Sequence, residues 1–240
     1  MRVLITDDRG PVARAAAARL AGEGHSVALN ALGGEPVPGC ERVRVDLKDD
    51  GALSALFTGW GSELGGVIHP APEPILASVE DCDDALWDAA FREGALASMA
   101  VTRAAGEAMA RNGRGALLYL GSFHAEKPVG NGFLYSMACA STQMLCREAA
   151  LDYGSRGVTC VYVRVGPLKG DGRLDNAHSN QYKGVALRYP ERAIPEPERF
   201  GALISFLLSE GAAPLNGSDV NAEGGYTLFY GIRREAHANG

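Results

Sequence analysis

Residues 1–30 read MRVLITDDRGPVARAAAARLAGEGHSVALN, and this stretch decides the fold class. Two short runs rich in Val, Ile and Leu, near residues 2–6 and 26–30, predict strands. The alanine-rich run between them predicts a helix over 11–22, because Pro11 suits the first helical position and Gly22 and Gly24 mark the end. A strand, a helix and a second strand in this order are typical of two parallel strands joined by a crossover helix.

The same alternation continues along the rest of the chain. Further strands are predicted near residues 42–46, 65–69, 115–120, 158–164 and 218–222, and further helices near 50–58, 84–93, 95–111, 135–153 and 197–209. This pattern predicts a doubly wound α/β fold, Rossmann-like, with a parallel sheet covered by helices on both faces. A length of 240 residues with 46% hydrophobic composition favours one domain over residues 1–240.

Two connections depart from this pattern. Residues 33–39, GGEPVPG, hold three glycines and two prolines, so a loop is expected there in place of a crossover helix. Residues 170–197 are polar and too long for an ordinary connection, which predicts a lid loop over a substrate. Basic and amide side chains of this loop indicate polar or anionic substrate groups: Arg173, Asn176, Arg188 and Arg192.

Composition narrows the class of partner. A net charge of −6 and a pI near 5.4 argue against nucleic acid and anionic membranes. No apolar run approaches the length of about 18 residues that a membrane helix needs. The chain starts directly in a strand without the features of a secretion signal, and its five cysteines form no C-x-x-C pair. We therefore expect a cytoplasmic protein that acts on a small molecule and binds no metal.

The turn after the first strand is the place where dinucleotide folds hold a pyrophosphate on a helix N-terminus. Here it contains Asp7, Asp8, Arg9, Gly10 and Pro11. Only Gly10 is a glycine, Pro11 lacks an amide hydrogen, and the two carboxylates repel phosphate by up to about 4 kcal/mol each at 4 Å and an effective dielectric of about 20. Arg9 could offset part of this repulsion. Alternatively, Asp7 or Asp8 simply caps the following helix.

A serine and a tyrosine carry the most specific motif. Ser122 closes the run Leu120-Gly121-Ser122, and Tyr135 opens Tyr135-Ser136-Met137-Ala138-Cys139-Ala140, thirteen positions later. With Gly166-Pro167 and residues 216–226, this spacing resembles the short-chain dehydrogenase/reductase family from Val3 to about Tyr226. The resemblance implies that Tyr135 exchanges a proton with an alcohol or carbonyl oxygen, that Ser122 hydrogen-bonds the same oxygen, and that NAD(P) is the cofactor.

The departures from the family fall on cofactor-binding positions. The family has glycine at Asp7, Pro11 and Ala13, lysine at Cys139, asparagine at Gly94, and Asn-Asn-Ala-Gly at His69-Pro70-Ala71-Pro72. Asn30, Ala31 and Leu32 offer no charge to the adenosine ribose. The resemblance leaves Asp46 as the candidate adenine contact, and Gly10, Ala31 and Gly166 as the other candidate cofactor contacts.

Without the lysine, Tyr135 needs another group to tune it, because an unperturbed tyrosine has a pKa of about 10. Neutral Cys139 cannot take that role and is expected to be helix packing. The cations that could replace the lysine are Arg9, Arg92, Lys127 and Arg164. His69 and His124 follow strands and are predicted to face the crevice, as a base or proton shuttle, or else as solvated loop residues.

Three functions remain open. The first is a non-redox enzyme, with lyase, isomerase or dehalogenase-like chemistry at a hydroxyl or carbonyl held by Ser122 and Tyr135, and without a cofactor. The alternative is an NAD(P)-dependent oxidoreductase with atypical cofactor contacts. The third is a catalytically silent partner subunit or ligand-binding module. The resemblance also implies a homodimer or homotetramer.

Overall fold

The computed structural model describes residues 1–128, 130–170, 174 and 176–228. One seven-stranded sheet has the order β3-β2-β1-β4-β5-β6-β7, and every neighbouring pair is parallel. The strands are β1 (Arg2–Ile5), β2 (Ser26–Asn30), β3 (Glu41–Val43), β4 (Leu64–Pro70), β5 (Gly115–Ser122), β6 (Val158–Val165) and β7 (Asp219–Ala222). The single-domain, doubly wound, Rossmann-like prediction is confirmed.

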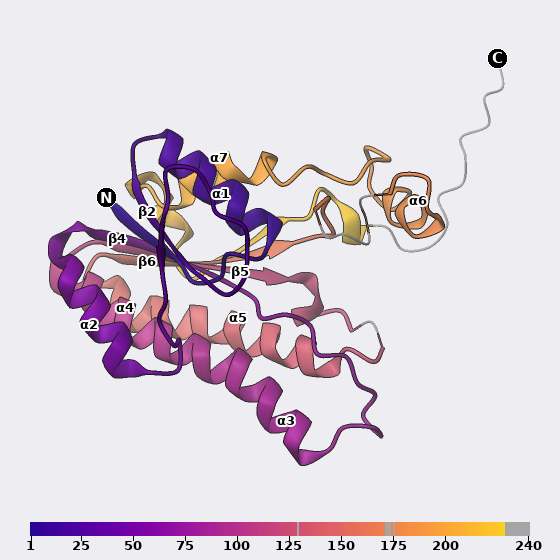
Figure 1. Cartoon of the computed structure of the whole chain (residues 1–240), viewed down its shortest axis with the longest axis horizontal. Helices are drawn as coiled ribbons and strands as arrows, with labels where there is room; N and C mark the ends of the chain where they lie inside the picture. The colour runs from indigo at the N-terminus through magenta and orange to yellow at the C-terminus, as the bar shows by residue number, and fades with distance from the viewer. Residues whose placement is uncertain (129, 171–173, 175, 229–240) are drawn as a thin grey trace.

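Helices cover both faces of the sheet (Figure 1). Helices α1 (Pro11–Gly22) and α7 (Arg199–Leu207) lie on one face, and α2 (Asp50–Trp60), α4 (Ala97–Asn112) and α5 (Phe133–Gly154) lie on the other. Helix α3 (Asp84–Phe91) runs into α4 through a π-helical turn, Arg92–Leu96. Because side chains alternate across each strand, the sheet separates two hydrophobic clusters.

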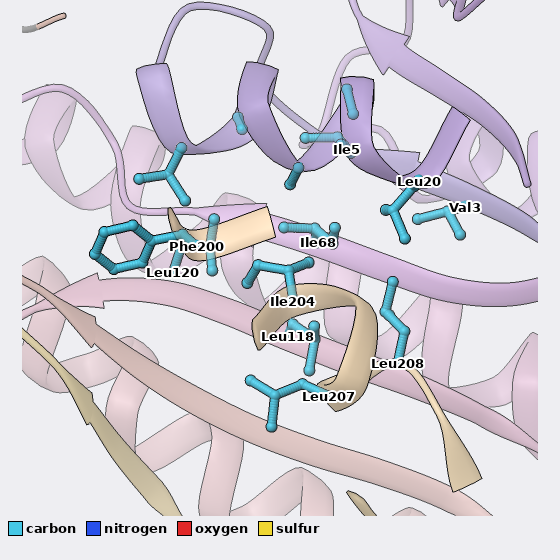
Figure 2. Packing of buried hydrophobic residues seen from close by; sticks show 14 of the residues in the cluster. Val3, Ile5, Leu20, Ile68, Leu118, Leu120, Phe200, Ile204, Leu207 and Leu208 are labelled. Carbon is cyan, nitrogen blue, oxygen red and sulfur yellow. The ribbon is translucent and has the colours of Figure 1, made fainter. Parts of the chain in front are cut away.

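The first helix shows how sequence produces this packing. Pro11 occupies the first turn of α1, and the small residues that follow bury one face of the helix. Figure 2 shows Leu20 of α1 beside Val3 of β1, and Phe200 and Ile204 of α7 in the same cluster. The two helices approach so closely that a Cβ on Gly201 would lie 2.9 Å from the Cβ of Arg19.

The two unusual connections have different outcomes. Residues 31–40 form no helix, as their glycines and prolines predict. The loop predicted over 170–197 contains a short helix, α6 (Asn180–Ala186), capped by the Ser179 hydroxyl, which accepts from the backbone N–H of Tyr182. Residues 171–173 and 175 of this loop, with Arg173 among them, lie outside the described residues.

The strand order places the crevice. Strand β1 pairs with β2 on one side and with β4 on the other. The chain therefore adds strands β2 and β3 on one side of β1 and strands β4 to β7 on the other side, and the direction reverses between β1 and β4. In doubly wound sheets, ligands bind at the carboxyl ends of the strands at this switch point. Within the described residues, no helix is long and apolar enough to cross a membrane, and no group of three or more metal-binding side chains is assembled.

Candidate active site

A cavity of about 580 Å³ lies at the carboxyl ends of the strands. Its walls are the β1–α1 turn, the segment after β4, the ends of β5 and β6, the start of α5 and part of α6. The residues that line it include Asp7, Arg9, Gly10, Pro11, Glu73, Ser122, His124, Tyr135, Gly166, Gly170, Leu174, Gln181 and Val185. The cavity has the size of a typical small-molecule site.

Ser122 and Tyr135 meet at the wall of this cavity. Ser122 is the last residue of β5 and Tyr135 lies in the first turn of α5. Both side chains line the cavity, and the Ser122 hydroxyl lies near enough to Tyr135 to lower the pKa of that phenol. The Ser122 hydroxyl oxygen also accepts from the backbone N–H of His124 at 3.3 Å. The structure therefore brings together the two residues that the motif spacing selects.

The surroundings of Tyr135 favour its neutral form. Burial raises the pKa of Tyr135 well above 10, the nearby Cys139 thiol raises it further, and the Ser122 hydroxyl offsets only part of this. The thiol itself is 1% exposed, and burial raises the pKa of Cys139 to about 11. Both groups keep their protons at neutral pH, so Tyr135 is a hydrogen-bond and proton donor there and not a base.

Three of the four cations considered as lysine replacements have other partners. Lys127 donates from Nζ to the Thr227 carbonyl at 3.1 Å. Arg164 pairs with Glu126 at 2.6 Å. Arg9 is held by carboxylates of the cavity wall, as described below. None of these cations is among the groups that shift the pKa of Tyr135.

His124 lines the cavity and lies beside Tyr135. Its ring packs edge-on against Tyr135, with ring centroids 5.8 Å apart, and is tilted against the ring of Phe123, with centroids 4.1 Å apart. Its Nδ1 lies 3.1 Å from the Lys127 carbonyl oxygen. Because a carbonyl only accepts hydrogen bonds, Nδ1 carries the hydrogen, and Nε2 is the unprotonated nitrogen of the neutral ring.

The expectation that His69 faces the crevice is wrong. His69 lies in β4 but is only 5% exposed and does not line the cavity. Its Nδ1 is 2.7 Å from the Thr6 hydroxyl and its Nε2 is 2.9 Å from the Ser98 hydroxyl. Both ring nitrogens thus find partners inside the protein, so neither is available to a substrate.

The buried network also fixes the proton on His69. The single hydroxyl hydrogen of Ser98 is directed at the Gly94 carbonyl, 2.7 Å away, so Ser98 accepts from Nε2–H. Nδ1 then accepts from the Thr6 hydroxyl. Burial lowers the pKa of His69 to about 4, and the Asp7 carboxylate offsets this only in part. His69 is therefore a neutral structural residue at pH 7.

The asparagine of the family has no room at Gly94. A Cβ at this position would lie 2.8 Å from the Cβ of Ala138 in α5. The close approach of the π-helical turn to α5 thus requires glycine, and the Gly94 carbonyl is occupied by Ser98. The glycine at this position therefore has a packing reason.

The cavity wall at the β1–α1 turn is acidic. Arg9 donates from Nε and Nη2 to the two oxygens of Asp7, at 3.0 and 2.6 Å, and its Nη1 lies 3.2 Å from Glu73. The single positive charge of Arg9 thus faces the two negative charges of Asp7 and Glu73, so this part of the cavity wall keeps one net negative charge. Arg9 offsets the charge of Asp7, as expected, but all three of its guanidinium nitrogens already face carboxylates.

Asp8 connects the same turn to the loop after β2. Its carboxylate accepts from the backbone N–H groups of Leu32 and Gly34 at 2.9 and 3.0 Å, and from Arg42 at 2.9 Å. Gly34 packs so tightly on the turn that a Cβ would lie 2.0 Å from the Asp8 carbonyl oxygen. The expectation that Asp7 or Asp8 caps α1 is wrong, because the N-cap is Gly10 and both carboxylates have other partners.

These contacts do not fit a pyrophosphate held at the turn. Pro11 offers no amide hydrogen at the helix start, and Asp7 and Glu73 place negative charge on the wall. Of the predicted cofactor contacts, Gly10 and Gly166 line the cavity, whereas Ala31 and Asp46 do not. The Asp46 side chain is 61% exposed and its carboxylate accepts from the backbone N–H of Lys48.

Replacing Asp8 by asparagine should lower the free energy of unfolding by about 1.5–3 kcal/mol at pH 7, because a charge-assisted buried bond is lost. Burial raises the pKa of Asp8, but the Gly34, Leu32 and Arg42 donors more than offset this and hold it below 3.8. A carboxyl whose pKa is lower in the folded protein than in the unfolded chain stabilises the fold at pH values above the unfolded pKa. This stabilisation is lost as the pH falls below about 4. Urea denaturation measures this, with exposed Asp46→Asn as a matched control that should change little. Equal stability of Asp8→Asn and wild type would contradict the contact.

The fold and the paired hydroxyls define a doubly wound α/β protein with a small-molecule site at the switch point of its sheet. A family model described as enoyl-(acyl carrier protein) reductase matches residues 7–227. The chain belongs to this family of short-chain dehydrogenases and reductases.

Relatives cover nearly the whole chain. The 3-oxoacyl-[acyl-carrier-protein] reductase MabA of Mycobacterium tuberculosis is 25% identical over 93% of this chain and 91% of its own length. D-threitol dehydrogenase of Mycolicibacterium smegmatis is 26% identical over 90% and 84%. The solved structure of a short-chain dehydrogenase/reductase from Burkholderia thailandensis has a TM-score of 0.83, with 22% identity, and covers 95% of this chain and 93% of its own. These relatives are all named as oxidoreductases.

Proposed function

We propose that the chain is an enzyme that holds the carbonyl or hydroxyl oxygen of a small molecule between Ser122 and Tyr135, with Tyr135 as the proton donor. One observation carries this proposal: Ser122 and Tyr135 line the same cavity, where burial keeps Tyr135 protonated. A neutral phenol can give a proton to an oxygen that gains negative charge, but it cannot remove one. At neutral pH Tyr135 therefore already carries the proton that reduction of a carbonyl requires.

The names of the relatives favour oxidation–reduction chemistry. They include reductases and dehydrogenases, and the enoyl-[acyl-carrier-protein] reductase FabI of Neisseria meningitidis, 27% identical over 77% of this chain, is named with NADH. We propose NAD(P) as the cofactor, with Asp46 as candidate adenine contact and Gly10, Ala31 and Gly166 as further candidates. The expectation that no cofactor is used receives no support from these relatives.

The donor set favours a second candidate, a non-redox reaction of lyase, isomerase or dehalogenase type at the same pair. Cys139 stands where the family has a lysine, and Asp7 and Glu73 make the wall acidic. In such a reaction Ser122 and Tyr135 would still bind and protonate the substrate oxygen, and the acidic end of the cavity would receive another part of the substrate.

Titration with NADH and NADPH separates the two candidates. At a concentration about 100 times Kd, binding stabilises a folded protein by about 2.7 kcal/mol, which for a chain of this size raises Tm by roughly 5–10 °C. The redox candidate predicts this shift and a change in nicotinamide fluorescence with at least one nucleotide. It also predicts consumption of the bound nucleotide with acetoacetyl-CoA, a 3-oxoacyl probe. Absence of both binding signals would reject it in favour of the non-redox reaction or a catalytically silent subunit.

Segment 170–197 remains our proposed substrate lid. Gly170, Leu174, Gln181 and Val185 line the cavity, and α6 lies at the end of the molecule toward which the strands point (Figure 1). These positions support a lid because the segment supplies part of the cavity wall.

We also propose a homodimer or homotetramer in the cytoplasm. A small hollow between α3 and α5 is lined by Trp87, Phe91 and Met137, which are 39%, 55% and 45% exposed. Apolar side chains gathered in this way are typical of interfaces between subunits.

A further inference from the structure

Tyr162 reaches the active-site serine from inside the sheet. It lies in the middle of β6 and is completely buried. Its hydroxyl oxygen accepts from the backbone N–H of Ser122 at 3.2 Å. The same hydroxyl lies 3.3 Å from the Cys139 carbonyl and 3.5 Å from the Ser122 carbonyl. Since a phenol has one hydrogen, the shorter distance assigns it to Cys139.

This hydroxyl connects the two elements that carry the proposed site. Ser122 ends β5, and Cys139 lies on α5 one turn after Tyr135. Two hydrogen bonds, from the Ser122 N–H to the Tyr162 hydroxyl and from that hydroxyl to the Cys139 carbonyl, therefore join the end of the strand to the start of the helix. The strand-to-helix distance sets how far Ser122 lies from Tyr135.

Gly121 makes room for the connection. A Cβ on Gly121 would lie 1.9 Å from the Tyr162 hydroxyl oxygen. Any side chain at this position would displace the hydroxyl from its place beside Ser122. Gly121 on β5 thus leaves the space that the Tyr162 hydroxyl on β6 fills. The local sequence around either residue does not reveal this contact.

We propose that Tyr162 is a positioning residue whose hydroxyl fixes Ser122 relative to α5 and so sets the contact between the Ser122 and Tyr135 hydroxyls. It does not line the cavity and acts only through Ser122 and α5. The inference builds on the proposed role of the Ser122–Tyr135 pair. Catalytic groups need their geometry held within about 0.5 Å by supporting bonds, which gives this buried connection its importance.

The contact can be tested without a substrate by fluorine NMR of protein labelled with 3-fluorotyrosine, which replaces all eight tyrosines. Loss of a signal in Tyr135→Phe assigns the Tyr135 resonance. Ser122→Ala is expected to shift this resonance because it removes the neighbouring hydroxyl. Tyr162→Phe should shift it in the same direction, and the Ser122→Ala/Tyr162→Phe double variant should shift it no further than Ser122→Ala alone.

Tyr119→Phe is the matched control. Tyr119 is the register partner of Tyr162 on β5, is 1% exposed, and its hydroxyl lies 2.7 Å from that of Thr102, away from Ser122. It should lower Tm, as Tyr162→Phe does, because both remove a buried hydrogen bond. It should leave the Tyr135 resonance in place. A merely structural role for Tyr162 would give the same result in both variants.

Three outcomes would overturn the proposal: no shift in Tyr162→Phe, a further shift in the double variant, or no shift in Ser122→Ala. Gly121→Ala, which displaces the hydroxyl while keeping Tyr162, should reproduce the shift and covers the case in which Tyr162→Phe does not fold. With acetoacetyl-CoA as probe, Tyr162→Phe should lower kcat by roughly 10–100-fold with KM little changed. Expected NMR shifts in a protein without reductase activity would reject the redox function and leave the positioning role standing.

Discussion

Tyr135→Phe is expected to lower the rate of the reaction by about 10²–10⁴-fold, the usual value of a general acid, with little change in KM. Phenylalanine keeps the ring and its packing against His124, so only the hydroxyl is lost. The measurement is steady-state reduction of acetoacetyl-CoA with the nucleotide that binds. If no nucleotide binds, it is turnover of a substrate found by screening halohydrins, hydroxy acids and ketones.

The pH profile gives this prediction a second readout. Burial raises the pKa of Tyr135, so the phenol is the active form throughout the neutral range. If Tyr135 acted as a phenolate base, the rate would rise between about pH 7 and 10, and this rise would be absent in Tyr135→Phe. We expect no such rise in the wild type. Such a rise would contradict the assignment of Tyr135 as a donor.

Tyr153→Phe is the control for the loss of a tyrosine hydroxyl from α5. Tyr153 lies at the opposite end of the same helix and does not line the cavity. Its replacement should leave the rate unchanged. An unchanged rate in Tyr135→Phe itself would mean that the tyrosine is idle and would favour a silent subunit or binding module.

Acidification from pH 6.5 to 4 is expected to remove up to about 3 kcal/mol of stability through His69 alone. Burial lowers the pKa of His69 to about 4 from 6.5. Between these pH values His69 binds a proton in the unfolded chain but not in the folded protein. The contribution of His69 to the free energy of unfolding is therefore fully present above about pH 6.5 and decreases as the pH falls toward 4. Below that, the contribution of His69 no longer changes.

Urea denaturation at several pH values, comparing the wild type with His69→Gln and His69→Asn, measures this effect. Both variants are expected to be less stable at pH 7, because contacts with Thr6 and Ser98 are weakened. Their stability should nevertheless fall less between pH 6.5 and 4. The Asp8 contribution changes only below about pH 5 and is shared by the wild type and both variants, so it does not account for a difference between them. The same slope in variants and wild type would exclude His69 as its source.

Most of the fold could be predicted from local sequence. The seven predicted strands and six predicted helices are all present, because each carries its own apolar run or a face of small residues. Helix α6 was missed since its polar residues give no periodic apolar face. The absence of a crossover helix in residues 31–40 was predicted from glycine and proline alone.

Less of the site could be predicted. The spacing between Ser122 and Tyr135 places both at the carboxyl edge of the sheet, and both line the same cavity there. The inward direction of His69 could not be foreseen, because its partners lie 63 and 29 positions away in sequence. The same holds for Tyr162, which contacts Ser122 across 40 positions.

The sequence by itself determined the order of strands and helices and the two hydroxyls of the candidate site, because periodicity and turn residues act over a few neighbouring positions. Only the tertiary structure decided that Asp8 binds the loop after β2, that His69 stays neutral, and that Tyr162 supports Ser122. Each of these depends on buried polar groups finding partners on other strands and helices. Burial makes an unpartnered polar group costly, so the assembled fold selects the partner.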